Sequence, residues 1–291
     1  MDWTTSFSDQ EWTGLVGRYD ALLGPGKLDE VFGFIPMMHD LRPDTLKRFR
    51  LVADIVTQGM GLASGMPNPP VCSMIAGHYN TVIGYPEGIA ADLFLAKRIG
   101  GRRDEVADIL SMAWLHSGMS GMATAARVCQ PLLASWSPAD DGPGLPWPQG
   151  WASDSEAFRS GVDFEDYDGA TEVDPADIAA ITRWHERVQG EVPPYVAFFG
   201  EHFPLALIGF RARFETSFSG ALPTQFIALC QVQLAACWKQ PDALRRALYM
   251  ARHFGVTKEQ AAQVLAYSQL FLGDLGMDAV LTEASSFFAD W

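Results

Sequence analysis

The sequence predicts an all-α fold made of two tandem copies of one helical domain. Apolar residues recur with the three- and four-residue spacing of helices along nearly the whole chain, and almost no segment alternates strictly as a strand does. The stretch Pro86 to Ala125 also aligns with Pro241 to Val280, 155 residues later, with ten identities in forty positions. A repeat of this length far exceeds a solenoid unit, so we expect two fused domains related by internal duplication.

A second match, offset by 161 residues, lies upstream of the first. It pairs Glu30-Val31 with Glu191-Val192, Pro43 with Pro204, and Phe49-Arg50 with Phe210-Arg211. The six-residue difference between the two offsets is expected in the Gly-rich stretch from Gln58 to Pro67. We place the first domain at residues 1–136, a linker at 137–174 and the second domain at 175–291.

Composition limits the class of protein. The chain has 291 residues, 48% of them hydrophobic, and a net charge of −14, which disfavours nucleic acid and anionic membranes as partners. No apolar run approaches a membrane span and Met1-Asp2-Trp3 is not a basic signal segment, so we predict a cytoplasmic protein. Its four cysteines, Cys72, Cys129, Cys230 and Cys237, show no CxxC pair and no metal-ligand spacing, and we predict that they are small buried apolar groups.

The helices can be placed in order. Asp44 to Met60 should be a helix with one buried face, formed by Leu46, Phe49, Val52, Ile55 and Val56. An apolar helix follows from Val71 to Ile83. Pro86 and Pro241 then suit the first turn of a helix, and Gly100 and Gly255 supply left-handed stops.

A further helix follows in each copy, from Arg103 to about Ser117 and from Lys258 to about Leu272. Thr257 and Gln260 have the spacing of a capping box, and Gly118 and Gly273 are expected to end these helices.

The linker at 137–174 is acidic and rich in Pro, Gly and Trp. It also contains aromatic residues throughout, which disordered tethers usually lack, so we expect it to lie on a domain surface. Two interpretations stay open: a strap that covers apolar surface, or a lid over a pocket.

The segment from Ala251 to Gln260, Ala-Arg-His-Phe-Gly-Val-Thr-Lys-Glu-Gln, resembles the helix-turn-helix of the carboxymuconolactone decarboxylase and AhpD alkylhydroperoxidase-like superfamily. The resemblance covers most of the chain, as two AhpD-like copies. It implies an all-α fold, a homo-oligomer and active sites near subunit interfaces.

The chain departs from the functional residues of that superfamily. The CxxC of its peroxidase members would fall on Tyr85 and Gly88 in the first copy and on Gln240 and Ala243 in the second. The family histidine is replaced by Asp92 and by Ala247, and the proton-relay glutamate would fall near Ser73 and Ala228. A thiol peroxidase needs a low-pKa thiolate and a resolving partner, so that activity is disfavoured.

Asp92 is the first candidate catalytic residue, because it is an acid in an otherwise apolar run at the position of the family imidazole. Burial would raise its pKa towards the range useful for acid–base catalysis, whereas the alternative is a solvated helix residue. Tyr85 could donate a hydrogen bond to a substrate oxygen, or pack as an aromatic at a helix start. His78 and Tyr79 lie inside an apolar helix, where His78 is either a general base or a core histidine bonded to a carbonyl.

Four further residues are candidates for substrate binding: Arg50, His39, His116 and Trp114. Arg50 could hold a substrate carboxylate. A structural ion pair is the favoured interpretation, because both copies keep the arginine, as Arg50 and Arg211, after a phenylalanine. His39 lies beside Asp40, which could orient it. His185 and His253 are predicted to be surface residues.

The sequence therefore predicts a cofactor-free enzyme that performs decarboxylation, lactone opening or isomerisation by proton transfer on a small carbonyl or carboxylate compound, with no metal site. Asp92 or His78 would move the proton, Tyr85 or Tyr79 would support the oxyanion, and Arg50 would hold a carboxylate. The alternative is a catalytically silent binding or assembly protein of the same fold, and a peroxidase-related protein is a third choice.

Overall fold

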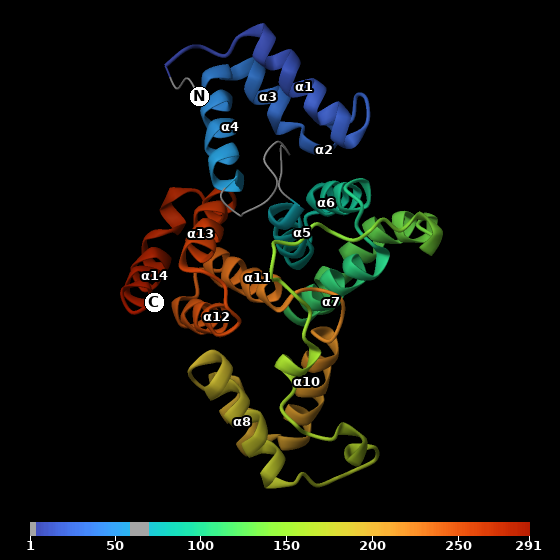
Figure 1. Ribbon diagram of the computed structural model, residues 1–291, viewed down its shortest axis with the longest axis vertical. Coiled ribbons are helices and arrows are strands. Elements are labelled where there is room, and N and C mark those ends of the chain that lie inside the picture. The colour runs from blue at the N-terminus through green and yellow to red at the C-terminus, as the bar shows by residue number, and fades with distance from the viewer. Residues whose placement is uncertain (1–3, 59–69) are drawn as a thin grey trace. The chain divides into compact units, whose positions relative to one another are not determined.

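The computed structural model describes residues 4–58 and 70–291, and the described residues form helices and connecting segments without a strand, as predicted (Figure 1). The α-helices are α1 (Asp9–Leu23), α2 (Leu28–Phe32), α3 (Phe34–Leu41), α4 (Pro43–Gln58), α5 (Pro70–Ile83), α6 (Pro86–Arg98), α7 (Arg103–Ser135), α8 (Pro175–Gln189), α9 (Pro194–His202), α10 (Pro204–Ser217), α11 (Thr224–Cys237), α12 (Pro241–His253), α13 (Lys258–Leu272) and α14 (Asp278–Ala289). Short 3-10 helices cover Pro138–Asp140, Ser155–Phe158, Phe164–Tyr167 and Asp274–Gly276.

The chain divides into two compact units, Met1–Gln149 and Gly150–Trp291. The division falls inside the segment 137–174, so its first part belongs to one unit and its second part to the other. The offset of the repeat was expected to change between Gln58 and Pro67. Of this stretch, only Gln58 belongs to the described residues.

In the first unit, α5 packs against α6 and α7 (Figure 1). Apolar side chains on several sides of α5 are buried, which suits a helix surrounded by others. A separate cluster joins the four N-terminal helices and contains Leu15, Tyr19, Leu28, Ile35 and Leu46. In the second unit, α11 packs against α12 and α13, and α12 contacts α8 and α14.

Helix boundaries recur between the units at the offset of 155 residues. Pro86 and Pro241 each stand at the first turn of a 13-residue helix, α6 and α12. Gly100 and Gly255 follow these helices with positive φ, 92° and 77°, a conformation that glycine adopts without a steric penalty. The sequence signals for helix start and stop are therefore confirmed in both units.

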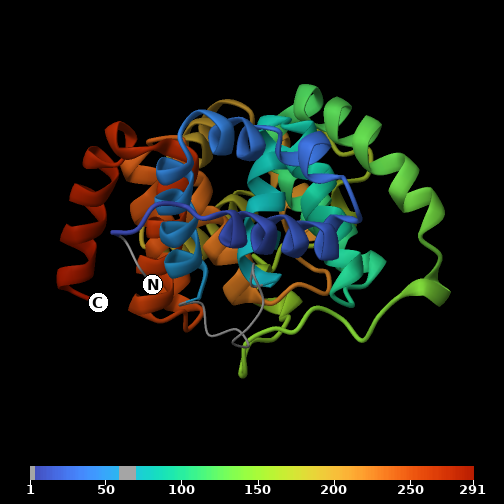
Figure 2. The same cartoon turned by 90° about the horizontal axis from the view of Figure 1, so that it is seen from above.

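The next helix differs between the units. Thr257 and Gln260 form the predicted capping box, and α13 ends before Gly273. In the first unit Gly118 also has a non-helical conformation, with φ 60° and ψ −158°, but the chain resumes the helix, so α7 continues through this kink to Ser135. Figure 2 shows the C-terminal half of α7 in green. The predicted end near Ser117 is thus a kink and not a terminus.

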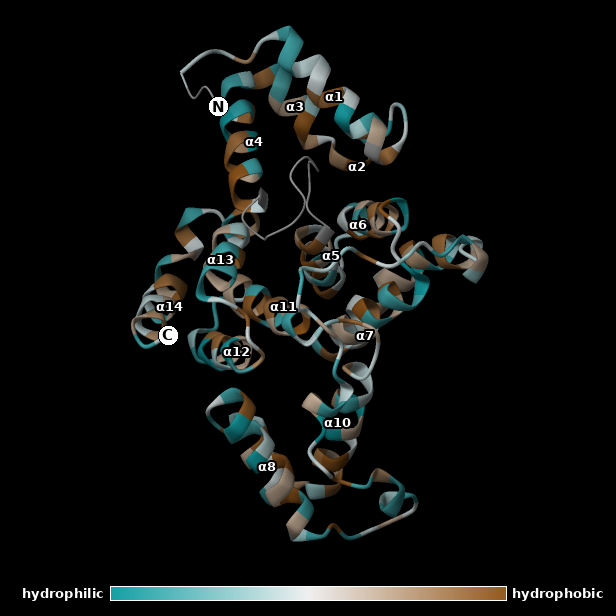
Figure 3. Ribbon diagram, viewed as in Figure 1, coloured by the Kyte–Doolittle hydropathy of each residue, from teal (hydrophilic) through white to brown (hydrophobic). Residues whose placement is uncertain are grey.

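Two predictions about burial are wrong. On α4, Leu46 and Val56 are buried as expected, but Val52 and Ile55 are 40% and 47% exposed, because the face that turns inward carries Ala53 and Thr57 instead. Figure 3 shows how apolar the C-terminal half of this helix is.

His185 was expected at the surface and is instead buried. Its Nδ1 lies 2.8 Å from Gln189 Oε1, and its ring meets the edge of Trp184. Desolvation lowers the pKa of His185 to about 4. His253 is exposed, as predicted.

A buried glutamate fixes residues 145–147 to the start of α7. Both carboxylate oxygens of Glu105 lie 3.1 Å from Leu145 N, and Trp147 Nε1 donates to Oε1 at 3.1 Å. The backbone N–H of Arg102 donates to Oε2 at 2.8 Å and completes a capping interaction. One carboxylate therefore satisfies three donors, two of them 40 residues or more away.

Replacing Glu105 with Ala should lower the free energy of unfolding by about 3 kcal/mol, because buried N–H groups lose their charged acceptor. Chemical denaturation followed by circular dichroism would measure the loss. Asp104→Ala is the matched control: Asp104 is adjacent and exposed, so the expected loss is below about 1 kcal/mol. Equal losses in both variants would contradict this role of Glu105.

Candidate functional site

The candidate site is built on the hairpin of α5 and α6. The turn between these helices is closed by a backbone hydrogen bond of 2.9 Å from Tyr85 N to Asn80 O, and Gly84 supplies the positive φ that the turn needs. Pro86 then starts α6. This connection places the C-terminal half of α5 beside the N-terminal half of α6.

The Asp92 carboxyl lies between the two helices. Asn80 Nδ2 donates to Asp92 Oδ2 at 2.9 Å. Two glycines make room for this pair: a Cβ on Gly77 would lie 3.1 Å from Asp92 Cβ, and one on Gly88 would lie 2.5 Å from Asn80 Nδ2. A glycine inside a helix costs about 1 kcal/mol relative to alanine. At these two positions the glycines therefore reduce the stability of each helix but allow α5 and α6 to pack closely.

This environment changes the acidity of Asp92. Burial raises its pKa from the ordinary value of 3.8 to about 8, and the hydrogen bond from Asn80 opposes that rise. The residue keeps some exposure, yet its carboxyl is desolvated because it packs on the backbone of α5. Asp92 can therefore hold and release a proton near neutral pH, unlike a solvated aspartate.

Tyr85 shares this environment. It precedes α6, and it is 38% exposed, more than Asp92. Burial first, then the charges of Glu87 and Asp92, raise the pKa of its hydroxyl, which favours the neutral, hydrogen-bond-donating form. Asp92 and Tyr85 are thus two proton-bearing groups of the α5–α6 hairpin, and the charge of Asp92 acts on the Tyr85 hydroxyl.

His78 belongs to a different group. It is fully buried on α5, and its ring meets that of His116 edge to face, with centroids 5.7 Å apart. Burial, and secondarily His116, hold its pKa well below the usual range, so the imidazole is neutral at neutral pH. Within the described part of the chain neither ring nitrogen has a hydrogen-bond partner, so the predicted bond to a carbonyl is absent. A buried imidazole in this state costs stability.

The corresponding position in the second unit has the same property. Gln233, 155 residues after His78, is fully buried on α11, and both atoms of its amide lack a partner among the described residues. Asp92 has no such counterpart, since Ala247 stands there. The buried polar position is shared by the units, whereas the raised-pKa carboxyl is specific to the first.

The other predicted site residues are dispersed. Tyr79 is buried, while Trp114 on α7 is exposed. His39 stacks on Trp12 with ring centroids 3.9 Å apart, and its Nδ1 lies 3.5 Å from the Asp40 carboxylate, as the sequence suggested.

Arg50 is held by its own unit. It donates to the Tyr19 hydroxyl at 2.9 Å and to Asp54 at 3.2 Å. Arg211 pairs in the same way with Glu215, four residues later, at 2.7 Å. The ion-pair interpretation of both arginines is confirmed. Arg50 lines a pocket of about 360 Å³ between α1 and α4.

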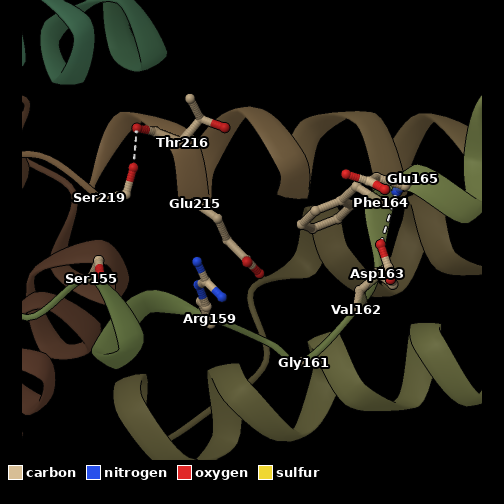
Figure 4. Close-up of a pocket in the computed structure, with 10 residues that line it drawn as sticks. All are labelled: Ser155, Arg159, Gly161, Val162, Asp163, Phe164, Glu165, Glu215, Thr216 and Ser219. Atoms are coloured by element: carbon tan, nitrogen blue, oxygen red, sulfur yellow. Dashed lines mark hydrogen bonds between the residues drawn. The ribbon is translucent and has the colours of Figure 1, made fainter.

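A larger pocket, of about 490 Å³, lies in the second unit between the end of α10 and residues 155–165 (Figure 4). The side chains of Arg159 and Glu215 both point into the space between these elements. The sequence did not indicate this pocket, because three of its four charged lining residues, Arg159, Asp163 and Glu165, come from the segment before α8.

The structure also bears on thiol and metal chemistry. All four cysteines are buried and none forms a disulfide, and burial raises the pKa of Cys72 to about 12 and that of Cys129 to about 11. Such thiols are poor nucleophiles. Residues 4–58 and 70–291 contain no group of three or more His, Cys, Asp and Glu side chains placed to hold a metal ion.

Within the same described ranges, none of the helices combines the length and hydrophobicity that crossing a membrane requires.

Comparison with known proteins identifies the fold. No family model and no curated protein matches the sequence. Among solved structures the chain is similar to one from Burkholderia xenovorans described as a putative gamma-carboxymuconolactone decarboxylase subunit, with a TM-score of 0.57 and 16% sequence identity over 96% of both chains. At this identity the likeness shows the fold alone. The predicted resemblance to the carboxymuconolactone decarboxylase and AhpD superfamily is therefore confirmed at the level of an all-α fold.

Proposed function

We propose that the protein is a carboxymuconolactone decarboxylase-like enzyme that transfers a proton to or from a small carbonyl or carboxylate substrate without a cofactor. One observation carries the proposal: a desolvated carboxyl, Asp92, whose pKa is raised to about 8 and whose charge acts on the hydroxyl of Tyr85. The fold shared with the Burkholderia xenovorans chain supports it.

For decarboxylation, the chemistry balances with Asp92 as the acid. Loss of carbon dioxide from the substrate carboxylate leaves an electron pair on the adjacent carbon, and a neighbouring substrate carbonyl spreads this charge onto oxygen. The proton of Asp92 converts that carbon into C–H, and the aspartate regains a proton from water. Tyr85 donates a hydrogen bond to the oxygen on which charge develops. The same pair serves isomerisation or lactone opening, where the carboxylate form takes the proton first.

The roles of the other predicted residues change with their positions. Arg50 is engaged by Asp54 and Tyr19, so we do not assign it to the substrate carboxylate of this reaction. His78 is neutral and its ring meets that of His116, so we do not assign it as the base of this reaction.

A second candidate is an assembly or binding role, and exposed apolar residues favour it. On α3 and α4 these are Phe34, Met37, Leu41, Val52 and Ile55, and on α9, α10 and the residue between them they are Tyr195, Phe198, Phe203, Leu205 and Phe210. Apolar patches of this kind usually mark interaction surfaces. A homo-oligomer that buries them is compatible with catalysis, so the two functions do not exclude each other.

Asp92→Asn should abolish turnover, because the amide cannot supply a proton, while preserving the fold. Gamma-carboxymuconolactone is the first substrate to assay, by release of carbon dioxide. Glu87→Gln, which alters an exposed acid on the same helix, should retain activity within about twofold.

The pH dependence of activity is a second test of Asp92. In the parent protein kcat/KM should fall as pH rises through about 8. Asn80→Ala should move this decrease to higher pH, because the hydrogen bond from Asn80 lowers the pKa of Asp92. Full turnover by Asp92→Asn would exclude Asp92 as the proton donor.

The raised pKa of Asp92 can also be tested without a substrate, by measuring stability as a function of pH. The folded pKa of Asp92 lies above the ordinary 3.8, so its contribution is fully present below that value and is lost as pH rises towards about 8. Relative to Asp92→Asn, the free energy of unfolding of the parent should fall across this window by up to about 1.4 kcal/mol per pH unit. Urea denaturation at a series of pH values measures it. Parallel curves for the two proteins would show that Asp92 is solvated.

The assembly role predicts a change of mass in solution. Phe198→Glu adds a charge to the exposed apolar face of α9 and should lower the molecular mass measured by sedimentation. Leu275→Glu is the control, because Leu275 is an isolated residue that is 96% exposed. An unchanged mass for Phe198→Glu would exclude this face from the assembly.

A further inference from the structure

In the second unit, residues 157–167 occupy the groove between α8 and α10. Trp184 on α8 donates from Nε1 to the Ala157 carbonyl at 3.0 Å. Arg211 on α10 donates from Nη2 to the Phe158 carbonyl. Glu215 accepts from Ser160 N at 2.8 Å, and Figure 4 shows its side chain pointing from α10 towards this segment. These contacts bind the main chain of the segment and not only its side chains.

The same segment continues down the groove. Val162 packs in one cluster with Ile181 of α8 and Ile208 of α10. The Tyr167 hydroxyl then donates to the Asp177 carboxylate at 2.6 Å. A peptide segment that begins and ends in short 3-10 helices is therefore bound between two helices by an arginine, a carboxylate and an apolar floor.

The first unit contains a groove of the same construction between α1 and α4. The helix caps Ser8 and Asp174 are 166 residues apart, and at the same offset the buried Leu15 of α1 matches the buried Ile181 of α8. At the offset of 161 residues, α4 and α10 both begin with proline, and Arg50 and Asp54 match Arg211 and Glu215.

This first groove is an open pocket of about 360 Å³ lined by Gly14, Arg18, Arg50, Leu51 and Asp54, among others. That volume lies in the range of ligand-binding clefts. The Nε of Arg50 is buried there and has no acceptor among the described residues. The arginine and carboxylate that bind main-chain groups in the second unit are thus present beside an accessible cavity in the first.

The two grooves differ in charge. The first is lined by three cations, Arg18, Lys47 and Arg50, and by two carboxylates, Glu11 and Asp54, which gives +1 in a chain of −14. At the offsets above, Trp184 and Ile208 replace Arg18 and Lys47 in the second unit. The segment 154–168 has six acidic residues and one arginine, a net charge of −5. A groove of the first kind attracts a peptide with this character.

We propose that the groove between α1 and α4 binds an acidic peptide segment of a partner protein, as the groove between α8 and α10 binds residues 157–167. Arg50 keeps its bonds to Tyr19 and Asp54 and donates a remaining N–H to a peptide carbonyl, as Arg211 does while paired with Glu215, and Asp54 accepts from a peptide N–H. Arg18, which is exposed at the rim, binds an acidic side chain. Lys47 stays with Glu11, 2.8 Å away, and with Thr5.

The test titrates a fluorescein-labelled synthetic peptide of residues 154–168 into the full-length protein and follows fluorescence anisotropy. Gly14 and Gly17 offer a matched pair of variants, because both are exposed on α1 and a Cβ added to either would meet no atom within 4 Å, yet only Gly14 lines the pocket. Gly14→Gln should weaken binding at least about tenfold and Gly17→Gln less than about twofold.

Charge reversal supplies a second pair. Arg18→Glu should weaken binding, whereas Arg48→Glu, with the same change in net charge outside the pocket, should not. Binding that Gly14→Gln leaves unchanged, or the absence of saturable binding, overturns the proposal. A change of oligomeric mass on Gly14→Gln with no peptide binding also overturns it, in favour of a second copy of the chain.

Discussion

The close approach of α5 and α6 is the constraint on which the candidate site depends. Gly77 and Gly88 remove the side chains that would separate the helices, and the space is taken by the Asn80 amide and the Asp92 carboxyl. The carboxyl is thereby withdrawn from water with one hydrogen bond to offset the loss. Its raised pKa is the electrostatic consequence of that packing, so backbone geometry and proton chemistry have one origin here.

The two units share several structural features but differ in their candidate sites. They share helix starts, glycine stops, a buried polar position on α5 and α11, and an arginine paired with an acid four residues later. Only the first has an acid at the position of Asp92, and only the second has its α8–α10 groove filled by the segment before α8. Proton chemistry and peptide binding are thus proposed for different parts of the first unit, while the second unit contains the filled version of the groove.

Local signals predicted the fold because they act within a few residues. Proline at a first turn, glycine after a last turn and the Thr257–Gln260 box each fix a boundary through backbone geometry, whatever the tertiary context. Asp92 was recognisable for a similar reason, as an acid in an apolar run. By contrast, Asn80 and the two glycines could not be assigned to it from the sequence, since their meeting depends on how two helices cross.

Burial was predicted less well, for the same physical reason. Val52 and Ile55 have the hydrophobicity of core residues and lie outside, while His185 and Glu105 lie inside because other residues accept or supply their hydrogen bonds. A local signal also failed to predict the end of α7. Gly118 has nearly the same backbone conformation as Gly273, which follows the last residue of α13, yet the helix resumes after Gly118.

The contacts that fix the segment 137–174 span long stretches of sequence: 40 residues from Glu105 to Leu145, 53 from Arg211 to Phe158 and 55 from Glu215 to Ser160. Closing such loops costs entropy before any contact forms, so these pairings have a high contact order. Such contacts form more slowly than the local hydrogen bonds within the helices that provide Glu105, Arg211 and Glu215. During synthesis residues 154–168 leave the ribosome before α10, so Arg211 and Glu215 cannot bind this segment until α10 has emerged.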